Sequence, residues 1–331
     1  MTGHDYSAGP RIVRGRWKAG AARAVIGAMA CALAACGGGG SGSPAPSPSP
    51  TPTPSPTPTP PPFPRYDELT SETDLRASTL TFVDSSLVTA LVEPVASSTV
   101  RVDPVADTLT LLFAGRSVTV GPGDLTSSDE ESDIYEIVQG SVRTTVTTLR
   151  PEVDGQRVDY LRLFRFSETE IGTNQPIGDL VNLLGGLETD DADVVAQGDG
   201  QYTGLFRGIG RLDSIPSIAD EDSDPFNSAA VTIDAANRTV TVTFDFEGRA
   251  LSDSSRVRDG GSFRGEATLS DDGSSFEGVL ERLDAGGEAD VGTFAGAFYG
   301  PEADEVAIQY EIDAITRPGV FFAGQIYGRR D

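Results

Sequence analysis

From residue 66 to the C-terminus, apolar and polar residues alternate in short runs separated by Gly, Asp-Gly and Ser-Asp clusters. Alternation with a period of two is typical of β-strands that have one face on a core and the other in water. The clearest run is 239–246, in which Val, Val, Phe and Phe share one face and Thr, Thr, Thr and Asp share the other. The pattern predicts an all-β protein.

The last third of the chain contains eight such runs joined mostly by short connections. Phe-x-Gly recurs six times within them, and residues two apart in a strand share a face. A ring beside a residue without a side chain would let a strand curl while the ring fills the interior. Because closure removes exposed edges, we predict an eight-stranded antiparallel up-and-down β-barrel over residues 197–331. The predicted strands are 201–212, 229–234, 239–247, 262–269, 275–283, 291–299, 305–313 and 320–328.

Charged residues occupy outward positions of the predicted barrel strands, for example Arg264, Glu266, Glu277 and Glu281. A barrel that spans a membrane needs an outward apolar band. The predicted barrel therefore faces water and is a soluble barrel.

A second β-rich domain is predicted upstream, over residues 66–190. The segment 177–187 is predicted as its only helix, kept short by its glycines, and the acidic tract 188–193 is predicted to separate the two domains. The acidic loop 127–133 is expected to be exposed. Strands are expected at 79–83, 99–103, 108–113, 116–120, 141–149 and 158–166.

The N-terminus has the pattern of a bacterial lipoprotein leader. A basic segment precedes the apolar run 24–33, which is too short to span a bilayer, and Leu33-Ala34-Ala35-Cys36 follows. We predict a signal peptide over 1–35, acylation of Cys36, and outer-membrane sorting permitted by the glycine that follows it. The segment 36–65 is rich in Gly, Pro, Ser and Thr and is predicted to be an extended stalk. Membrane attachment is expected through the lipid anchor alone.

Removal of the leader restricts the available chemistry. The only His, Lys and Trp of the chain (His4, Lys18 and Trp17) would leave with it, so histidine-dependent nucleophiles, Schiff-base lysines and histidine zinc sites are excluded. The acidic run 220–224 imitates the start of an EF-hand loop, but Pro225 and Val231 stand where Gly and Glu are needed. No catalytic residue and no metal site is predicted, although a carboxylate-dependent hydrolase and a weak cation contact in an acidic loop stay open as alternatives.

The charge of the chain is strongly negative. It has 25 basic and 50 acidic residues, a net charge of −25, and the leader holds five of the basic residues but only one of the acidic ones. A surface of this sign repels DNA, RNA and anionic headgroups. Nucleic acid is therefore not an expected partner.

Residues 292–307 resemble the penultimate barrel hairpin of the transferrin-binding protein B-like family of surface lipoproteins. Residues 319–325 resemble the last barrel strand of that family, and residues 200–208 resemble its first. In the hairpin, Gly300-Pro301 is predicted to form a tight turn, Phe294 and Phe298 to share the inner face, and Tyr299 to be a packing residue. The residues that carry the signature are Gly292, Phe294, Gly296, Phe298, Tyr299, Gly300 and Pro301.

The resemblance implies one lobe, in which a β handle domain (66–190) precedes the barrel. It implies a non-catalytic protein whose loops bind a host or environmental protein or a haem-type ligand for iron acquisition, with an outer-membrane receptor or translocon barrel as a further partner. It transfers no ligand-binding residue, and the alternative is a structural or adhesive surface lipoprotein with no uptake role. No cofactor is expected, and haem would have to be ligated by tyrosine. The candidates are Tyr66, Tyr135, Tyr160, Tyr202, Tyr299, Tyr310 and Tyr327.

Overall fold

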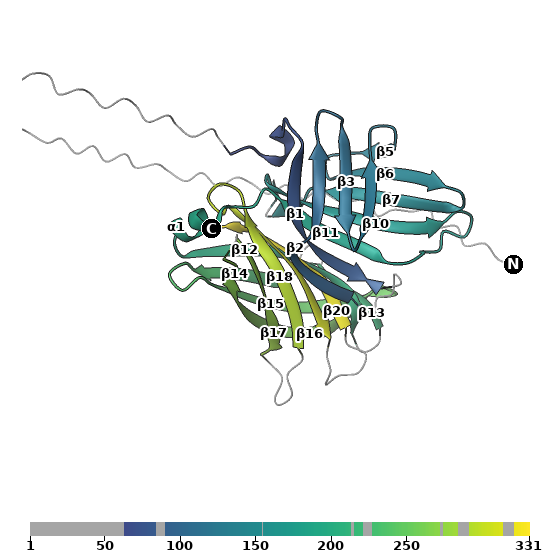
Figure 1. Cartoon of the computed structure of the whole chain (residues 1–331). Helices are drawn as coiled ribbons and strands as arrows, with labels where there is room; N and C mark the ends of the chain where they lie inside the picture. The colour runs from purple at the N-terminus through teal and green to yellow at the C-terminus, as the bar shows by residue number, and fades with distance from the viewer. Residues whose placement is uncertain are drawn as a thin grey trace, which may run out of the picture. The chain divides into compact units, whose positions relative to one another are not determined.

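Antiparallel β-sheets account for most of the structure, which is a computed structural model (Figure 1). It describes residues 63–83, 90–153, 155–212, 215–220, 227–271, 274–283, 291–313 and 321–331, all within one compact unit, Pro60–Asp331. The predicted signal peptide, Cys36 and nearly all of the predicted stalk lie outside the described residues, as does most of the acidic run 220–224.

The first sheet, called the handle sheet below, has the strand order β4-β3-β2-β1-β11-β10-β7-β6-β5. Its first and last strands in sequence, β1 and β11, therefore pair at its centre, with Ala77 opposite Gly185. A short 3₁₀ helix, η1 (Tyr66–Glu68), precedes it, and a small hairpin, β8 (Glu152–Val153) and β9 (Gln156–Arg157), precedes β10. Its strands are β1 (Thr73–Phe82), β2 (Ala90–Asp103), β3 (Thr108–Phe113), β4 (Arg116–Val120), β5 (Leu125–Ser128), β6 (Ser132–Gln139), β7 (Val142–Leu149), β10 (Leu161–Glu170) and β11 (Leu180–Gly186).

The prediction of a helix over 177–187 is wrong, because this segment contains β11. The strand is buried on both faces: Val181 and Leu183 belong to the core of the handle sheet, and Leu184 packs on the opposite side. A strand that is buried on both faces does not alternate between polar and apolar residues. Its short apolar run could therefore be either a strand or a helix when only the sequence is considered. Gly186 is required by close packing, since an added Cβ would lie 2.7 Å from Leu161 Cα and 2.9 Å from the Tyr299 ring.

The acidic loop 127–133 forms a hairpin between β5 and β6, and β5 is exposed along its whole length, as expected. Asp129 organises the turn by accepting hydrogen bonds from the backbone N–H groups of Glu131 (2.9 Å) and Ser132 (2.7 Å). Carboxylates that bond to their own backbone in this way are typical of tight turns.

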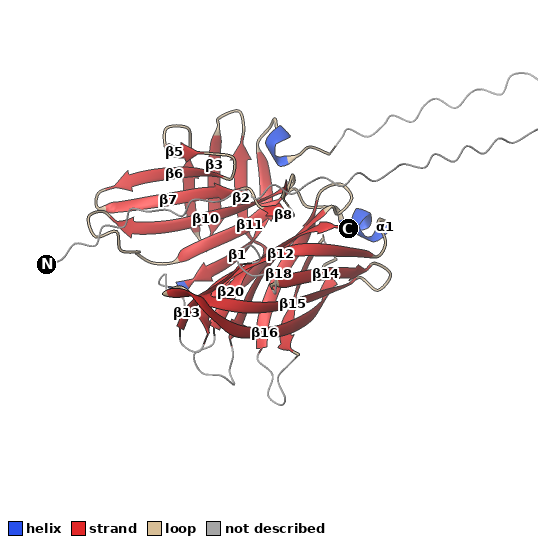
Figure 2. Ribbon diagram, turned by 180° about the vertical axis from the view of Figure 1, so that it is seen from behind, coloured by secondary structure: helices blue, strands red, loops and turns tan. Residues whose placement is uncertain are grey.

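The second sheet, called the barrel sheet below, closes on itself. Its first strand in sequence, β12, pairs with its last, β20, from Tyr202 opposite Arg330 to Arg211 opposite Phe321. Figure 2 shows it from behind, with β12, β14, β15 and β16 wrapping around one side. Its strands are β12 (Gly200–Leu212), β13 (Ile215–Asp220), β14 (Ser228–Asp234), β15 (Thr239–Ala250), β16 (Asp253–Leu269), β17 (Ser275–Arg282), β18 (Val291–Tyr299), β19 (Glu305–Asp313) and β20 (Phe321–Arg330).

The predicted eight-stranded antiparallel barrel is confirmed, with one added strand. Among the described residues, β13 and β14 share one position: β14 pairs with the first half of β12, β13 pairs with its second half, and both pair with β15. The circuit therefore has eight positions built from nine strands. The prediction missed β13.

The interior of the barrel is filled by aromatic rings, as the Phe-x-Gly pattern predicts. Phe206 is fully buried and stacks on Phe246 and Tyr310 with ring centroids 5.2 Å apart. An added Cβ at Gly278 would lie 2.7 Å from the Phe294 ring, so the ring of one strand occupies the space that the glycine of its neighbour leaves free. The six predicted rings all belong to this core: Phe206, Phe246, Phe263, Phe276, Phe294 and Phe322.

The segment between the two sheets contains α1 (Asp191–Ala196), whose Val194 joins the barrel core. Asp191 accepts a hydrogen bond from Arg238 (2.7 Å), which lies in the β14–β15 turn. Of the helical segments in the described ranges, none is long and apolar enough to cross a membrane.

Candidate functional site

The handle sheet and the barrel sheet meet in an apolar interface. Leu163 and Leu184 of the handle sheet share a buried cluster with Leu205 and Tyr327 of the barrel sheet. Strand β2 also lies against β17, β18 and β19. Because barrel residues alternate inward and outward, the strands that face the handle are apolar on both sides, which explains the almost complete burial of β18, β19 and β20.

The signature hairpin of the sequence lies at this interface. Phe294 and Phe298 point into the barrel core, as predicted, whereas Tyr299 points the other way and packs in the interface cluster. Tyr299 is fully buried, which agrees with the predicted packing role, and among the described residues its hydroxyl has no hydrogen-bond partner. Gly300 has φ +89°, and an added Cβ there would lie 2.7 Å from the Tyr160 ring of the handle. The hairpin therefore packs against the barrel core on one side and against the handle on the other.

Polar contacts hold the ends of this hairpin to the handle. The Thr189 hydroxyl donates to the Gly300 carbonyl at 2.5 Å. Glu305 is 1% exposed, and its two carboxylate oxygens accept the backbone N–H groups of Asp159 (2.5 Å) and Tyr160 (3.1 Å). Burial raises the pKa of Glu305 from 4.5 to about 7, although the two N–H donors oppose the rise.

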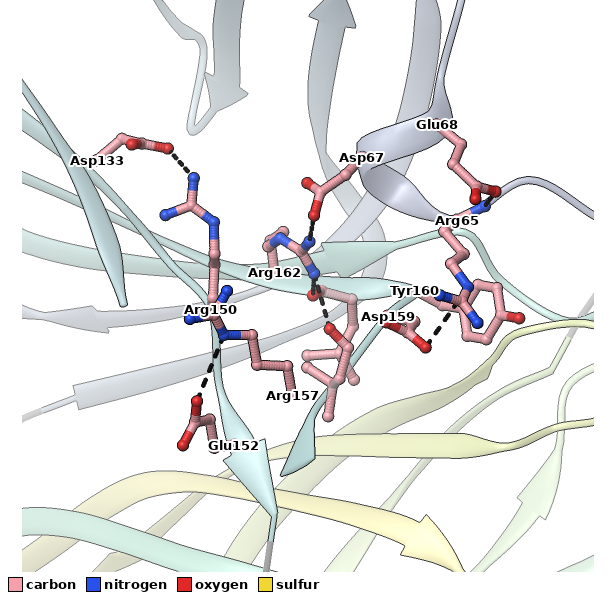
Figure 3. Close-up of polar contacts among 12 residues, drawn as sticks. Arg65, Asp67, Glu68, Asp133, Arg150, Glu152, Arg157, Asp159, Tyr160 and Arg162 are labelled. Atoms are coloured by element: carbon pink, nitrogen blue, oxygen red, sulfur yellow. Dashed lines mark hydrogen bonds and ion pairs between the residues drawn. The ribbon is translucent and has the colours of Figure 1, made fainter. Parts of the chain in front are cut away.

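The handle segment that receives Glu305 is itself fixed by a buried arginine (Figure 3). Arg162 is 3% exposed and donates to the Val158 carbonyl (3.0 Å) and to Asp67 Oδ2 (2.9 Å). Its guanidinium lies 4.5 Å from the centre of the Tyr66 ring, a cation–π distance. These contacts fix the 157–162 segment from the handle side, independently of its bonds to Glu305.

A cavity of about 760 Å³ lies between the two sheets. The handle contributes residues from β1, β7, β8, β10 and β11, and the barrel contributes residues from β12, β13 and β20. A volume of this size is within the range of pockets that hold small organic molecules. The polar residues that line it include Arg165, Asn182, Arg207, Gln325 and Tyr327.

Among the candidate haem ligands, the deeply buried tyrosines are poorly suited to bind iron. Tyrosine binds iron as the phenolate, and burial raises the pKa of Tyr202, Tyr310 and Tyr327. The hydroxyl of Tyr202 donates to the Ala303 carbonyl (2.7 Å) and that of Tyr310 to the Arg207 carbonyl (3.2 Å), so both are engaged. Tyr327 is the one candidate that lines the cavity. The three candidates in the handle are half-buried: Tyr66, Tyr135 and Tyr160.

Several residues of the interface were not anticipated from the sequence: Arg165, Asn182, Glu305, Gln309 and Gln325. No local spacing marks them. The partners of Glu305 and Gln309 lie more than a hundred residues away in the sequence, and Arg165 and Asn182 meet only because β10 pairs with β11. In the described part of the chain, no three His, Cys, Asp or Glu side chains are grouped to hold a metal ion.

No family model matches the chain, and no curated protein sequence matches it. The structure combines a nine-stranded handle sheet with a closed barrel sheet, and the signature hairpin of the barrel packs against the handle. The chain is similar to transferrin-binding protein B. A mutant of transferrin-binding protein B from Haemophilus parasuis Hp5 matches 78% of this chain at 15% identity, with a TM-score of 0.47. The match covers 45% of the transferrin-binding protein B chain, so this chain spans less than half of its length.

Two shorter solved structures match over most of their own length. HpuA from Kingella denitrificans, solved in complex with human haemoglobin, covers 79% of this chain and 87% of its own at 10% identity, with a TM-score of 0.35. The N-lobe domain of lactoferrin-binding protein B of Moraxella bovis covers 80% and 100% at 14% identity, with a TM-score of 0.30. This chain has a single handle sheet and a single barrel sheet in its described residues.

Proposed function

We propose that this protein is a lipid-anchored lobe on the bacterial outer membrane that binds a host iron protein for iron acquisition and catalyses no reaction. The observation that carries the proposal is the signature hairpin, whose rings Phe294 and Phe298 fill the barrel while Tyr299 and Gly300 fit against the handle. The residues by which the sequence resembles the surface lipoproteins thus lie where the two parts of the lobe join. An anchored binding lobe needs no catalytic groups, in keeping with the chemistry left after leader removal.

The anchor is proposed at Cys36, with a stalk over residues 36–65. Labelled palmitate should be incorporated into the wild-type protein and into a Cys31→Ser variant, because Cys31 lies within the proposed leader. A Cys36→Ser variant should incorporate none. Labelling of the Cys36→Ser variant, or loss of label from the Cys31→Ser variant, would contradict the proposed anchor site.

The binding role is tested with purified host iron proteins. The names of the similar structures define the panel: transferrin, lactoferrin and haemoglobin. We expect saturable binding of at least one of them to the immobilised chain in the micromolar range or tighter. We also expect that deleting the gene slows growth when that protein is the only iron source. Absence of binding to all three, together with unchanged growth, would refute the proposal in favour of a structural or adhesive surface lipoprotein without an uptake role.

A further inference from the structure

The cavity between the sheets is bordered by two separate apolar clusters. Leu163 and Leu205 belong to the interface cluster described above, whereas Phe82 and Ala323 belong to a second cluster. All four residues line the cavity, so each cluster contributes one residue from the handle sheet and one from the barrel sheet to its wall. The two sheets therefore pack against each other around the cavity without filling it.

Part of this apolar wall is not covered by protein. Leu149, Leu180 and Ile209 line the cavity and are only half-buried, although each packs against one of the two clusters. Ile218 of β13 also lines the cavity and is 38% exposed. Apolar surface that stays in contact with water is unfavourable, and a molecule that covers it is stabilised by the burial. These side chains therefore favour a ligand with an apolar body.

The buried polar groups of the wall carry no charge. Asn182, Gln325 and Tyr327 line the cavity and are 4%, 7% and 2% exposed. Burial raises the pKa of Tyr327, so its hydroxyl stays protonated and can donate a hydrogen bond. The amide nitrogen of Gln325 has no hydrogen-bond partner among the described residues. Since a buried donor without a partner is unfavourable, an oxygen atom on a bound molecule would stabilise this wall.

The charged residues of the cavity do not select for an ion. Two are basic and two are acidic, Arg165, Arg207, Glu131 and Glu152, and all four are exposed to solvent. The fifth, Arg150, forms an ion pair with a carboxylate of β6. Because water and neighbouring groups compensate these charges, an ionic ligand would lose its own hydration without finding an uncompensated opposite charge.

We propose that this cavity binds an uncharged, largely apolar small molecule that carries one hydroxyl, amide or carbonyl group. That group lies on Gln325 and Tyr327, and the apolar body lies on the side chains of the two clusters. The volume of about 760 Å³ suits a molecule of this kind. The inference does not rest on the proposed capture of an iron protein.

The first test uses phenylnaphthylamine, an uncharged fluorescent probe, and the unlipidated chain from Cys36 onward. The probe should bind with one-to-one stoichiometry. Decanol should displace it at concentrations about tenfold or more lower than decanoate, which has the same chain length but carries a charge that must be dehydrated. Absence of saturable probe binding, or displacement by decanoate that equals or exceeds displacement by decanol, would overturn the proposal.

The second test places a charge on the apolar wall. Ile209→Asp should weaken probe binding by about tenfold or more, because the bound probe would have to cover a carboxylate. Val279→Asp is the matched control, since Val279 is 51% exposed on β17 and is not among the residues that line the cavity. The control should bind the probe within about twofold of the wild type. Equal losses in the two variants would contradict the assigned site.

A third variant keeps the proposal open to refutation if Ile209→Asp fails to fold. Gln325→Leu nearly retains the volume of the side chain and removes the unpartnered donor. It should weaken displacement by decanol by about fivefold, the effect of losing one hydrogen bond to an uncharged group, and should leave binding of phenylnaphthylamine nearly unchanged. An unchanged effect of decanol would show that the polar group of the ligand does not lie on Gln325.

Discussion

Replacing Glu305 with glutamine should remove a pH dependence from the stability of the protein. Glu305 begins β19, is 1% exposed, and accepts the backbone N–H groups of Asp159 and Tyr160 in the handle. Burial is the main reason that its pKa rises from 4.5 to about 7, and the nearby carboxylate of Asp159 adds to the rise. Arg329 and the two N–H donors act in the opposite direction.

The sign follows from proton binding. The folded state holds the Glu305 proton up to about pH 7, whereas the unfolded chain releases it near its ordinary pKa of 4.5. The stabilisation is therefore complete below about pH 4.5 and is lost as the pH rises through about 7. A rise of this size corresponds to about 3 kcal/mol between the two limits.

Urea unfolding from about pH 4.5 to about pH 8 measures this effect as the difference in free energy of unfolding between wild type and variant. Relative to Glu305→Gln, the wild type should lose about 3 kcal/mol across this range. The exposed Glu302 in the preceding turn supplies the control, because Glu302→Gln should leave the pH dependence of the wild type intact. A difference that stays constant with pH, or that favours the wild type as the pH rises, would refute the reasoning.

Three further substitutions test the packing of the barrel by urea unfolding. Phe206→Ala removes a fully buried ring from the centre of the aromatic core and should cost about 3–5 kcal/mol; a loss below about 1 kcal/mol would contradict that packing. Tyr202→Phe leaves the Ala303 carbonyl without its donor and should cost about 1–2 kcal/mol, so an unchanged stability would argue against the bond. Gly324→Ala places a methyl group against the backbone of the neighbouring strand β12 and should lower the free energy of unfolding by about 2 kcal/mol or more. Gly123 has open space around it, so Gly123→Ala should change the free energy of unfolding by no more than about 0.5 kcal/mol. Equal losses in the two variants would show that β20 can shift to make room for the methyl group.

The barrel could be predicted from the sequence because those of its strands that lie away from the handle have one face in water and one on the core. In residues 239–246 the burial alternates along the strand as the apolar pattern does. Strand β13 was missed for a physical reason: Pro216 interrupts its short run, and proline in a run argues against a strand. Here the proline is accommodated in a short strand that fills half of one position in the barrel.

The interface could not be predicted in the same way. Strands β11 and β20 are buried on both faces, so alternation does not distinguish the face that meets the other sheet from the face that meets the strand's own core. Arg165 and Gln325 belong to strands in different sheets, and their common cavity depends on how the sheets pack, which no local period records. The same applies to Glu305, whose partners are backbone groups of the handle.

The pairing of β12 with β20 has a consequence for the synthesis of the chain. Of the described strands, β20 leaves the ribosome last, and until it is present both β12 and β19 expose backbone groups that can pair with another chain. A nascent or truncated polypeptide that stops before Phe321 would therefore be prone to aggregate through these two edges.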